Sequence, residues 1–117
     1  MAISVMDKTH ISEEILRLSE AIVRTFKPLK IILFGSYAYG IPREDSDVDM
    51  LVVLPFEGKN PEMAAKILNQ TDPHFPIDLL VRTPEQLRER LAAGDFFIKE
   101  ITERGKVLYE ATHKRMD

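Results

Sequence analysis

The sequence predicts a small domain of the α/β (α+β) class, with a small mixed β-sheet and helices packed on it. Apolar residues that recur at steps of three and four near the N-terminus indicate an amphipathic helix. Short apolar runs that end at glycine or proline, such as LKIILF at 29–34, indicate buried strands. These segments alternate over 117 residues, which is the length of one domain, so we treat residues 1–117 as a single domain.

The first helix is expected to place five apolar side chains on one face, namely Ile11, Ile15, Leu18, Ile22 and Phe26. Thr9 or Ser12 is a suitable N-cap for this helix, and Pro28 would end it. A short helix from Ser36 and a polar loop at 41–46 are expected to follow the strand at 29–34.

Prolines and glycines divide the rest of the chain. Strands are expected at 47–54, 77–82 and 106–109, and a helix at 61–70. Thr83-Pro84-Glu85 is typical of a helix start, and this helix would end near Gly94. The last helix, at 95–104, would have Asp95 as its N-cap and Gly105 as a left-handed terminator.

The composition argues against several classes of protein. The chain has no cysteine, which rules out disulfides and thiolate metal sites and fits a reducing, cytoplasmic location. No run approaches the ~20 apolar residues that cross a bilayer, so no membrane is expected. The net charge of −3 makes nucleic acid a less favoured partner, because polyanions bind basic surfaces.

Three aspartates lie within five positions at the start of the strand at 47–54, in the run DSDVD. Because side chains alternate along a strand, Asp47 and Asp49 would project on one side and the apolar residues between them on the other. Two carboxylates about 7 Å apart repel each other unless a cation lies between them. A hard divalent ion such as Mg²⁺ takes these oxygen ligands together with substrate phosphates.

A third carboxylate, Asp78, interrupts the otherwise apolar strand PIDLLV. If this strand pairs beside the strand at 47–54, Asp78 can complete a cluster with Asp47 and Asp49. Such a cluster can hold two metal ions ~4 Å apart, the arrangement used for in-line displacement at phosphorus. The turn at Gly35 and Ser36 would expose backbone N–H groups and a hydroxyl, which suit a phosphate.

Each of these residues also has an ordinary structural interpretation. The DSDVD run resembles the start of a calcium-binding EF-hand loop, but Met50 and Phe56 occupy the positions of the required glycine and glutamate. Asp47 can be a turn residue before the strand, and Asp78 can be a charge that protects a sheet edge. Ser36 can cap the short helix, a role that does not exclude contact with a phosphate.

The combined spacing is more specific than any of its parts. Gly35-Ser36, ten intervening residues and then Asp47-Val48-Asp49 resemble the signature of the DNA polymerase beta-like nucleotidyltransferase superfamily. The resemblance covers nearly the whole chain, from LKIILFGSYAYG through DSDVDMLVVL and PIDLLVRTPEQL to ITERGKVLYE. With 117 residues and no helical accessory domain, the chain is similar to the minimal nucleotidyltransferase branch.

The resemblance implies the nucleotidyltransferase fold and roles for five residues. The catalytic residues and ligands of two Mg²⁺ ions would be Asp47, Asp49 and Asp78, and Gly35 and Ser36 would contact ATP or another NTP. Arg43 is a sixth candidate, as a nucleotide-binding residue that replaces a cation of the family. One position departs from the family, because many relatives carry an arginine where this chain has Tyr39. Arg43 and Lys59 are the candidates for the missing cation.

The resemblance further implies a metal-dependent transferase that moves a nucleoside monophosphate, AMP from ATP in the first instance, onto a hydroxyl of a partner protein. Minimal nucleotidyltransferases that resemble this chain pair with HEPN-domain ribonuclease toxins in prokaryotic toxin–antitoxin modules. There they are the antitoxin and modify the toxin, notably at a tyrosine. The alternative is a non-catalytic antitoxin that neutralises its partner by contact alone, and Tyr39 is the feature that favours it.

Overall fold

The computed structural model describes residues 2–43 and 45–112. Within these residues four strands form one sheet in the order β3-β2-β1-β4. They are β1 (Lys30–Phe34), β2 (Val48–Val53), β3 (Ile77–Arg82) and β4 (Lys106–Glu110). β1 is antiparallel to both β2 and β4, whereas β2 and β3 are parallel. The predicted small mixed sheet is therefore confirmed.

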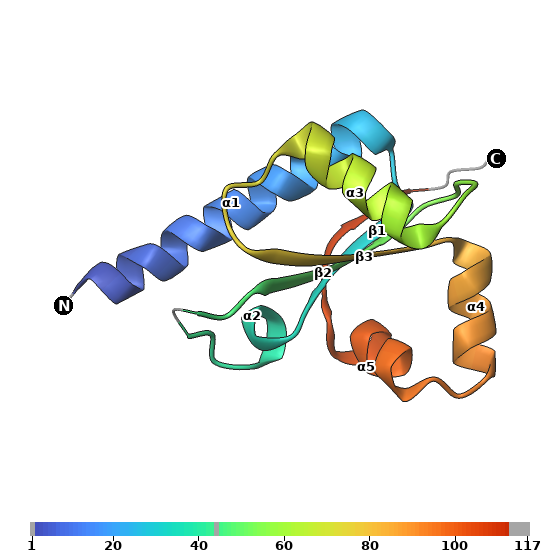
Figure 1. The fold of residues 1–117 in the computed structure, drawn as a ribbon. Helices are drawn as coiled ribbons and strands as arrows, with labels where there is room; N and C mark the ends of the chain where they lie inside the picture. The colour runs from blue at the N-terminus through green and yellow to red at the C-terminus, as the bar shows by residue number, and fades with distance from the viewer. Residues whose placement is uncertain (1, 44, 113–117) are drawn as a thin grey trace.

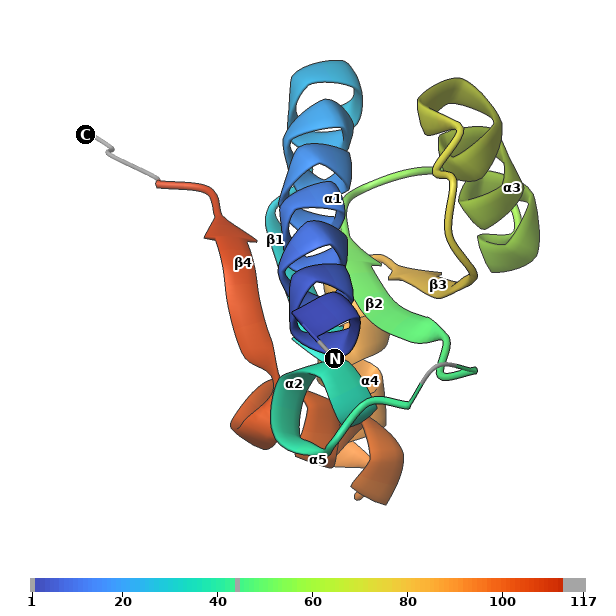
Figure 2. The same cartoon turned by 90° about the vertical axis from the view of Figure 1, so that its left-hand side faces the viewer.

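Helices lie on both faces of the sheet. In the described part of the chain they are α1 (Ala2–Phe26), α2 (Ser36–Tyr39), α3 (Asn60–Thr71), α4 (Pro84–Ala92) and α5 (Phe96–Arg104). α1 and α3 cover one face, and α4 and α5 lie on the other, with α2 close to the end where β2 begins (Figure 1). Figure 2 shows the molecule with the N-terminal end of α1 toward the viewer and with α2 and α5 below it. The contact of Arg104 with the Tyr39 ring shows that the ends of α2 and α5 are close together.

The strands contribute alternate side chains to two apolar layers. The layer under α1 and α3 includes Ile22, Met50 and Ile67, which are fully buried. The layer under α5 includes Leu51 and Ile101, which are also fully buried. Both faces of the sheet are thus covered by an apolar layer. Which layer a strand residue joins shows the face from which its side chain projects.

α1 begins earlier than the sequence predicts. The helix runs through Thr9 and Ser12 from Ala2, so the expectation that one of them is its N-cap is wrong. The physical reason is that residues 2–8 contain no glycine or proline that would stop the helix. Its end before Pro28 agrees with the prediction.

The apolar face of α1 packs as predicted where the structure describes it. Ile15, Leu18 and Ile22 are buried, and Phe26 is half-buried. The side chain of Ile11 lies outside the described residues. No helix among residues 2–43 and 45–112 combines the length and the apolar character needed to span a membrane.

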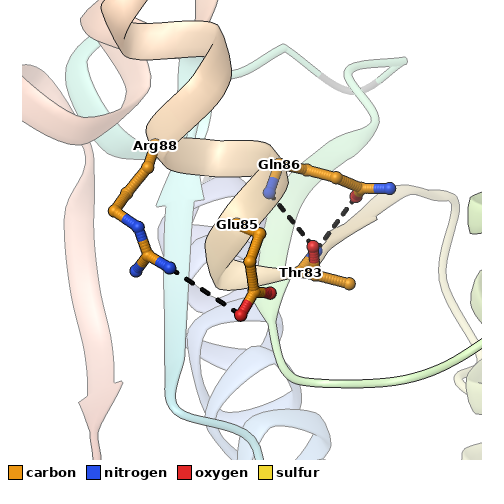
Figure 3. Close-up of polar contacts among 4 residues, drawn as sticks. All are labelled: Thr83, Glu85, Gln86 and Arg88. Carbon is orange, nitrogen blue, oxygen red and sulfur yellow. Dashed lines mark hydrogen bonds and ion pairs between the residues drawn. The ribbon is translucent and has the colours of Figure 1, made fainter.

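α4 starts with a capping box, which confirms the predicted helix start. The Thr83 hydroxyl oxygen accepts a hydrogen bond from the Gln86 N–H at 3.1 Å, and Gln86 Oε1 accepts one from the Thr83 N–H at 3.0 Å (Figure 3). Pro84 fills the first turn, and Arg88 pairs with Glu85 at 3.7 Å. These contacts satisfy backbone groups that a helix start otherwise leaves unpaired.

α5 has the predicted cap at its start but a different terminator at its end. Asp95 accepts hydrogen bonds from the Ile98 N–H at 3.1 Å and from Arg90 Nε at 2.9 Å, and these two bonds lower the pKa of Asp95. Gly105 is not left-handed, because its φ is −67°. Glycine is needed there for space: a Cβ atom would overlap the Ile101 carbonyl oxygen and Ile32 Cγ2.

Candidate functional site

Asp49 and Asp78 lie next to each other on neighbouring parallel strands. β2 and β3 pair in a register that makes Asp49 the partner of Asp78. Met50 follows Asp49 and Leu79 follows Asp78, and both of these apolar residues point into the layer under α1 and α3. Because successive side chains of a strand point to opposite faces, both carboxylates project from the other face of the sheet. The sequence prediction required these two strands to be neighbours, and this requirement is met.

Asp47 directly precedes β2 instead of lying within it, because the strand begins at Val48. Asp47 and Asp78 are exposed, whereas Asp49 is half-buried. Because β2 and β3 are parallel, both strands begin at the same end of the sheet. The three predicted carboxylates therefore gather at one end of the sheet, beside α2.

Gly35 packs directly against the Asp49 side chain. A Cβ atom at position 35 would overlap Asp49 Oδ2 and would lie 3.1 Å from Asp49 Cγ. The φ of Gly35 is +75°, which L side chains rarely adopt. Two independent constraints, space and backbone conformation, therefore require glycine at this position.

The environment of Asp49 raises the pKa of its carboxyl group above the ordinary value. Burial is the largest cause, followed by the negative charges of Asp78 and then of Asp47. Asp78 and Asp47 are therefore close enough for their charges to act on Asp49. A cation between them would relieve this repulsion.

The donor set suits a hard divalent cation, since carboxylate oxygens are the ligands that Mg²⁺ prefers. In the orientations that the side chains have in the structure, no three His, Asp or Glu side chains among residues 2–43 and 45–112 are close enough together to hold a metal ion. The Asp49 side chain packs against Gly35, but Asp47 and Asp78 are exposed and can turn without displacing packed atoms. The residues fit a metal whose binding draws the outer two carboxylates toward Asp49.

Ser36 is the first residue of α2 and not its N-cap. Gly35 occupies the cap position, and its carbonyl oxygen accepts hydrogen bonds from the N–H groups of Ala38 and Tyr39, both at 3.0 Å. The interpretation of Ser36 as a helix cap is therefore wrong. In the described part of the chain its hydroxyl has no hydrogen-bond partner, so it is available to a ligand.

The two cations proposed for the triphosphate lie in different places. Arg43 is exposed in the loop between α2 and β2, where its N–H donates to Ser46 Oγ at 2.8 Å. Among the described residues no ion pair joins Arg43 to an aspartate of the site. Lys59 follows the far end of β2 and precedes α3, so it is at the opposite end of the sheet and the suggestion that it serves the site is wrong.

Tyr39 makes a contact that was not predicted from the sequence. Its ring packs on the layer under α5, and the guanidinium carbon of Arg104 lies 4.4 Å from the ring centroid. No short-range pattern links two residues so far apart in the chain, so only the folded structure brings them together. The apolar residues of α5 are divided between core and surface: Ile98 and Ile101 are buried, whereas Phe96 and Phe97 are exposed.

Residues 15–109, most of the chain, match the family model described as the nucleotidyltransferase domain. No curated protein matches the chain. A solved structure from Sulfolobus solfataricus, assigned as a nucleotidyltransferase, has a TM-score of 0.58 and 18% identity over 73% of this chain and 78% of that one. The toxin–antitoxin MntA–HpeT with two aspartate-to-glutamate substitutions has a TM-score of 0.51 and 22% identity over 82% of this chain and 73% of that one. Likeness at these identities concerns the fold.

Proposed function

Because the chain belongs to the family of nucleotidyltransferase domains, we propose that it transfers a nucleoside monophosphate, AMP from ATP, to a hydroxyl group of a partner protein. The observation that carries the proposal is the register pairing of Asp49 with Asp78 beside the turn at Gly35. This pairing brings acidic side chains from two separate segments to one end of the sheet. A strand interior disfavours aspartate, so Asp49 in particular calls for a functional explanation.

Asp47, Asp49 and Asp78 would hold two Mg²⁺ ions. The ions would supply charge stabilisation at the entering and departing oxygens of the α-phosphorus. Asp49, which Gly35 and the sheet hold in place, would be the fixed member of the set, and the exposed pair would close around the cations. Asp78, on the neighbouring strand, would lie on the acceptor side, where it can receive the proton of the attacking hydroxyl.

The turn at Gly35 and Ser36 would hold the triphosphate. Ser36 Oγ is without a partner among the described residues, and a hydroxyl is a suitable donor to a phosphate oxygen. The acceptor hydroxyl would form a bond to the α-phosphorus as the bond to the leaving pyrophosphate breaks. Arg43, in the loop between α2 and β2, would provide a further charge for the departing pyrophosphate.

We propose a HEPN-domain toxin as the acceptor protein. MntA–HpeT, one of the structural neighbours, is a toxin–antitoxin pair, which supports a toxin as the partner. The two aspartates replaced in that structure are separated by one residue, as Asp47 and Asp49 are here, which supports a role for this pair. The chain would then be an antitoxin that acts by modifying its toxin.

The proposal is tested by incubating the purified chain with ATP labelled at the α-phosphorus, Mg²⁺ and a purified HEPN-domain toxin. We expect label on the toxin. Asp49→Asn should label the toxin about 100-fold more slowly than the wild-type chain, or more slowly still. The matched control is Asp45→Asn, which removes an exposed carboxylate from the loop that precedes β2 and should retain the wild-type rate. Tight binding without label would instead support neutralisation by contact alone.

A further inference from the structure

Arg104 is held beside the proposed triphosphate site by packing at the end of α5. Gly105, the next residue, packs so closely on β1 that a Cβ atom there would lie 3.1 Å from the Leu33 carbonyl oxygen. Lys106 is the register partner of Leu33 on β1. Arg104 precedes Lys106 by two residues, and Gly35 follows Leu33 by two. The end of α5 therefore packs against the end of β1 from which the Gly35 turn continues.

The side chain of Arg104 lies on the same face of the sheet as the carboxylates. Its guanidinium carbon is 4.4 Å from the centroid of the Tyr39 ring. Tyr39 is the last residue of α2, one helical turn from Ser36, and residues three apart on a helix are neighbours. The stacked ring thus holds a cation next to the turn that the proposed function assigns to the phosphates.

The guanidinium group retains hydrogen-bonding capacity. Arg104 Nη1 donates to Glu100 Oε2 at 3.1 Å, and 56% of the Arg104 side chain is exposed. A guanidinium carries five N–H donors, so one bond to a carboxylate leaves several for a second anion. Stacking on an aromatic ring and bidentate contact with phosphate are compatible for arginine, whereas lysine provides neither.

We propose that Arg104 is a triphosphate-binding residue, which reaches the β- and γ-phosphates of ATP from α5 while Tyr39 orients its guanidinium plane. The inference rests on the proposed function, because it assumes that ATP binds beside Gly35 and Ser36. It goes beyond that function because it assigns a triphosphate-binding cation to α5, in addition to Arg43 in the loop between α2 and β2.

The test measures binding of α,β-methylene ATP, which cannot release pyrophosphate, by calorimetry in the presence of Mg²⁺. Arg104→Ala should weaken binding about 10-fold or more, because it removes a charge-assisted contact. The affinity of Arg104→Lys should lie between those of the wild type and Arg104→Ala, since lysine keeps the charge but not the planar guanidinium that stacks on the ring. Adding Tyr39→Arg to Arg104→Ala should recover part of the lost affinity, because it returns a cation to the same place.

Arg17→Ala is the matched control. Arg17 is an exposed arginine that pairs with Glu13 four residues away, as Arg104 does with Glu100, but it lies on α1, across the sheet. Its loss should leave binding unchanged, and thermal melts should show that every variant is folded. Wild-type affinity in folded Arg104→Ala, or failure of the Tyr39→Arg addition to restore any binding, would overturn the inference.

The two proposals fail in different ways. If the wild-type chain binds the analogue through Arg104 but labels no acceptor, transfer is wrong and the role of Arg104 stands. If the chain labels its toxin and Arg104→Ala is unaffected in both assays, transfer stands and the role of Arg104 is wrong. A wild-type chain that binds no analogue would overturn both.

Discussion

Asp49 of β2 and Asp78 of β3 are register partners on adjacent parallel strands, and the charge of Asp78 raises the pKa of Asp49. A whole helix, α3, separates these strands in the chain. The acidic cluster is therefore created by the sheet and not by a local motif. The local DSDVD run supplies only two members of this cluster, Asp47 before β2 and Asp49 within it.

Asp49 should make the metal-free protein less stable at neutral pH. Its pKa is raised above the ordinary 3.8, so the native state holds the proton more tightly than the unfolded chain does. Stability is therefore expected to fall as the pH rises through the interval between 3.8 and the raised value. Without metal, Asn at position 49 should therefore raise the melting temperature at pH 7. No such gain is expected at pH 3.

Binding of Mg²⁺ at Asp49 can be followed in thermal melts with and without the cation. The cation should raise the melting temperature of the wild-type chain, since a ligand that binds only the native state stabilises it. Asp49→Asn should not respond to Mg²⁺. A wild-type chain that is insensitive to Mg²⁺, even at millimolar concentrations, would be at odds with a metal site.

Replacing Asp78 with Asn should lower the pKa of Asp49 without moving the backbone. The charge of Asp78 is the second cause of the raised value, after burial, so part of the shift should remain. Titration of the Asp49 carboxyl carbon by NMR measures the change directly. An unchanged Asp49 titration in Asp78→Asn would mean that the two carboxylates are not coupled.

Gly35→Ala should be more damaging than the same change at a glycine with free space around it. Both Gly35 and Gly94 have positive φ, +75° and +83°, so alanine is strained at either position. Only at Gly35 would the new Cβ atom also overlap the Asp49 carboxylate. We expect a loss of about 1 kcal/mol for Gly94→Ala and about 2–3 kcal/mol for Gly35→Ala.

Urea unfolding of the two variants separates strain from overlap. The Gly35 variant alone should also lose binding of α,β-methylene ATP, because relief of the overlap moves Asp49. Equal losses of stability, with nucleotide binding retained, would indicate that Gly35 serves only the turn.

Thr83→Ala should lower stability without affecting transfer. The substitution removes the hydroxyl of the capping box at the start of α4, which is worth about 1 kcal/mol. α4 contributes none of the proposed catalytic residues, so the rate of toxin labelling well below the melting temperature should be that of the wild type. A large loss of rate in folded Thr83→Ala would extend the site to α4.

Much of the fold followed from local patterns. The capping box at Thr83, the N-cap at Asp95 and the strand at 77–82 all have their causes within a few residues, and the structure contains each of them. The start of α1 was missed because no residue in 2–8 marks a boundary. The role of Gly105 was missed because its constraint comes from Ile32 on another strand.

The candidate site divides in the same way. The local DSDVD run brings Asp47 and Asp49 together in the sequence, but strand alternation does not apply to Asp47, which precedes β2. The position of Asp78 depended on which strands are neighbours. The contact between Gly35 and Asp49, and the stacking of Arg104 on Tyr39, join segments that no spacing rule connects. Long-range packing decided these contacts.

The most direct test of the account is an anomalous difference map from crystals of the chain grown with Mn²⁺ and α,β-methylene ATP. We predict two manganese peaks within about 2 Å of carboxylate oxygens of Asp47, Asp49 and Asp78, with the phosphates next to Ser36. Nucleotide bound elsewhere, or a map in which the Asp78 carboxylate turns away from bound manganese, would contradict it.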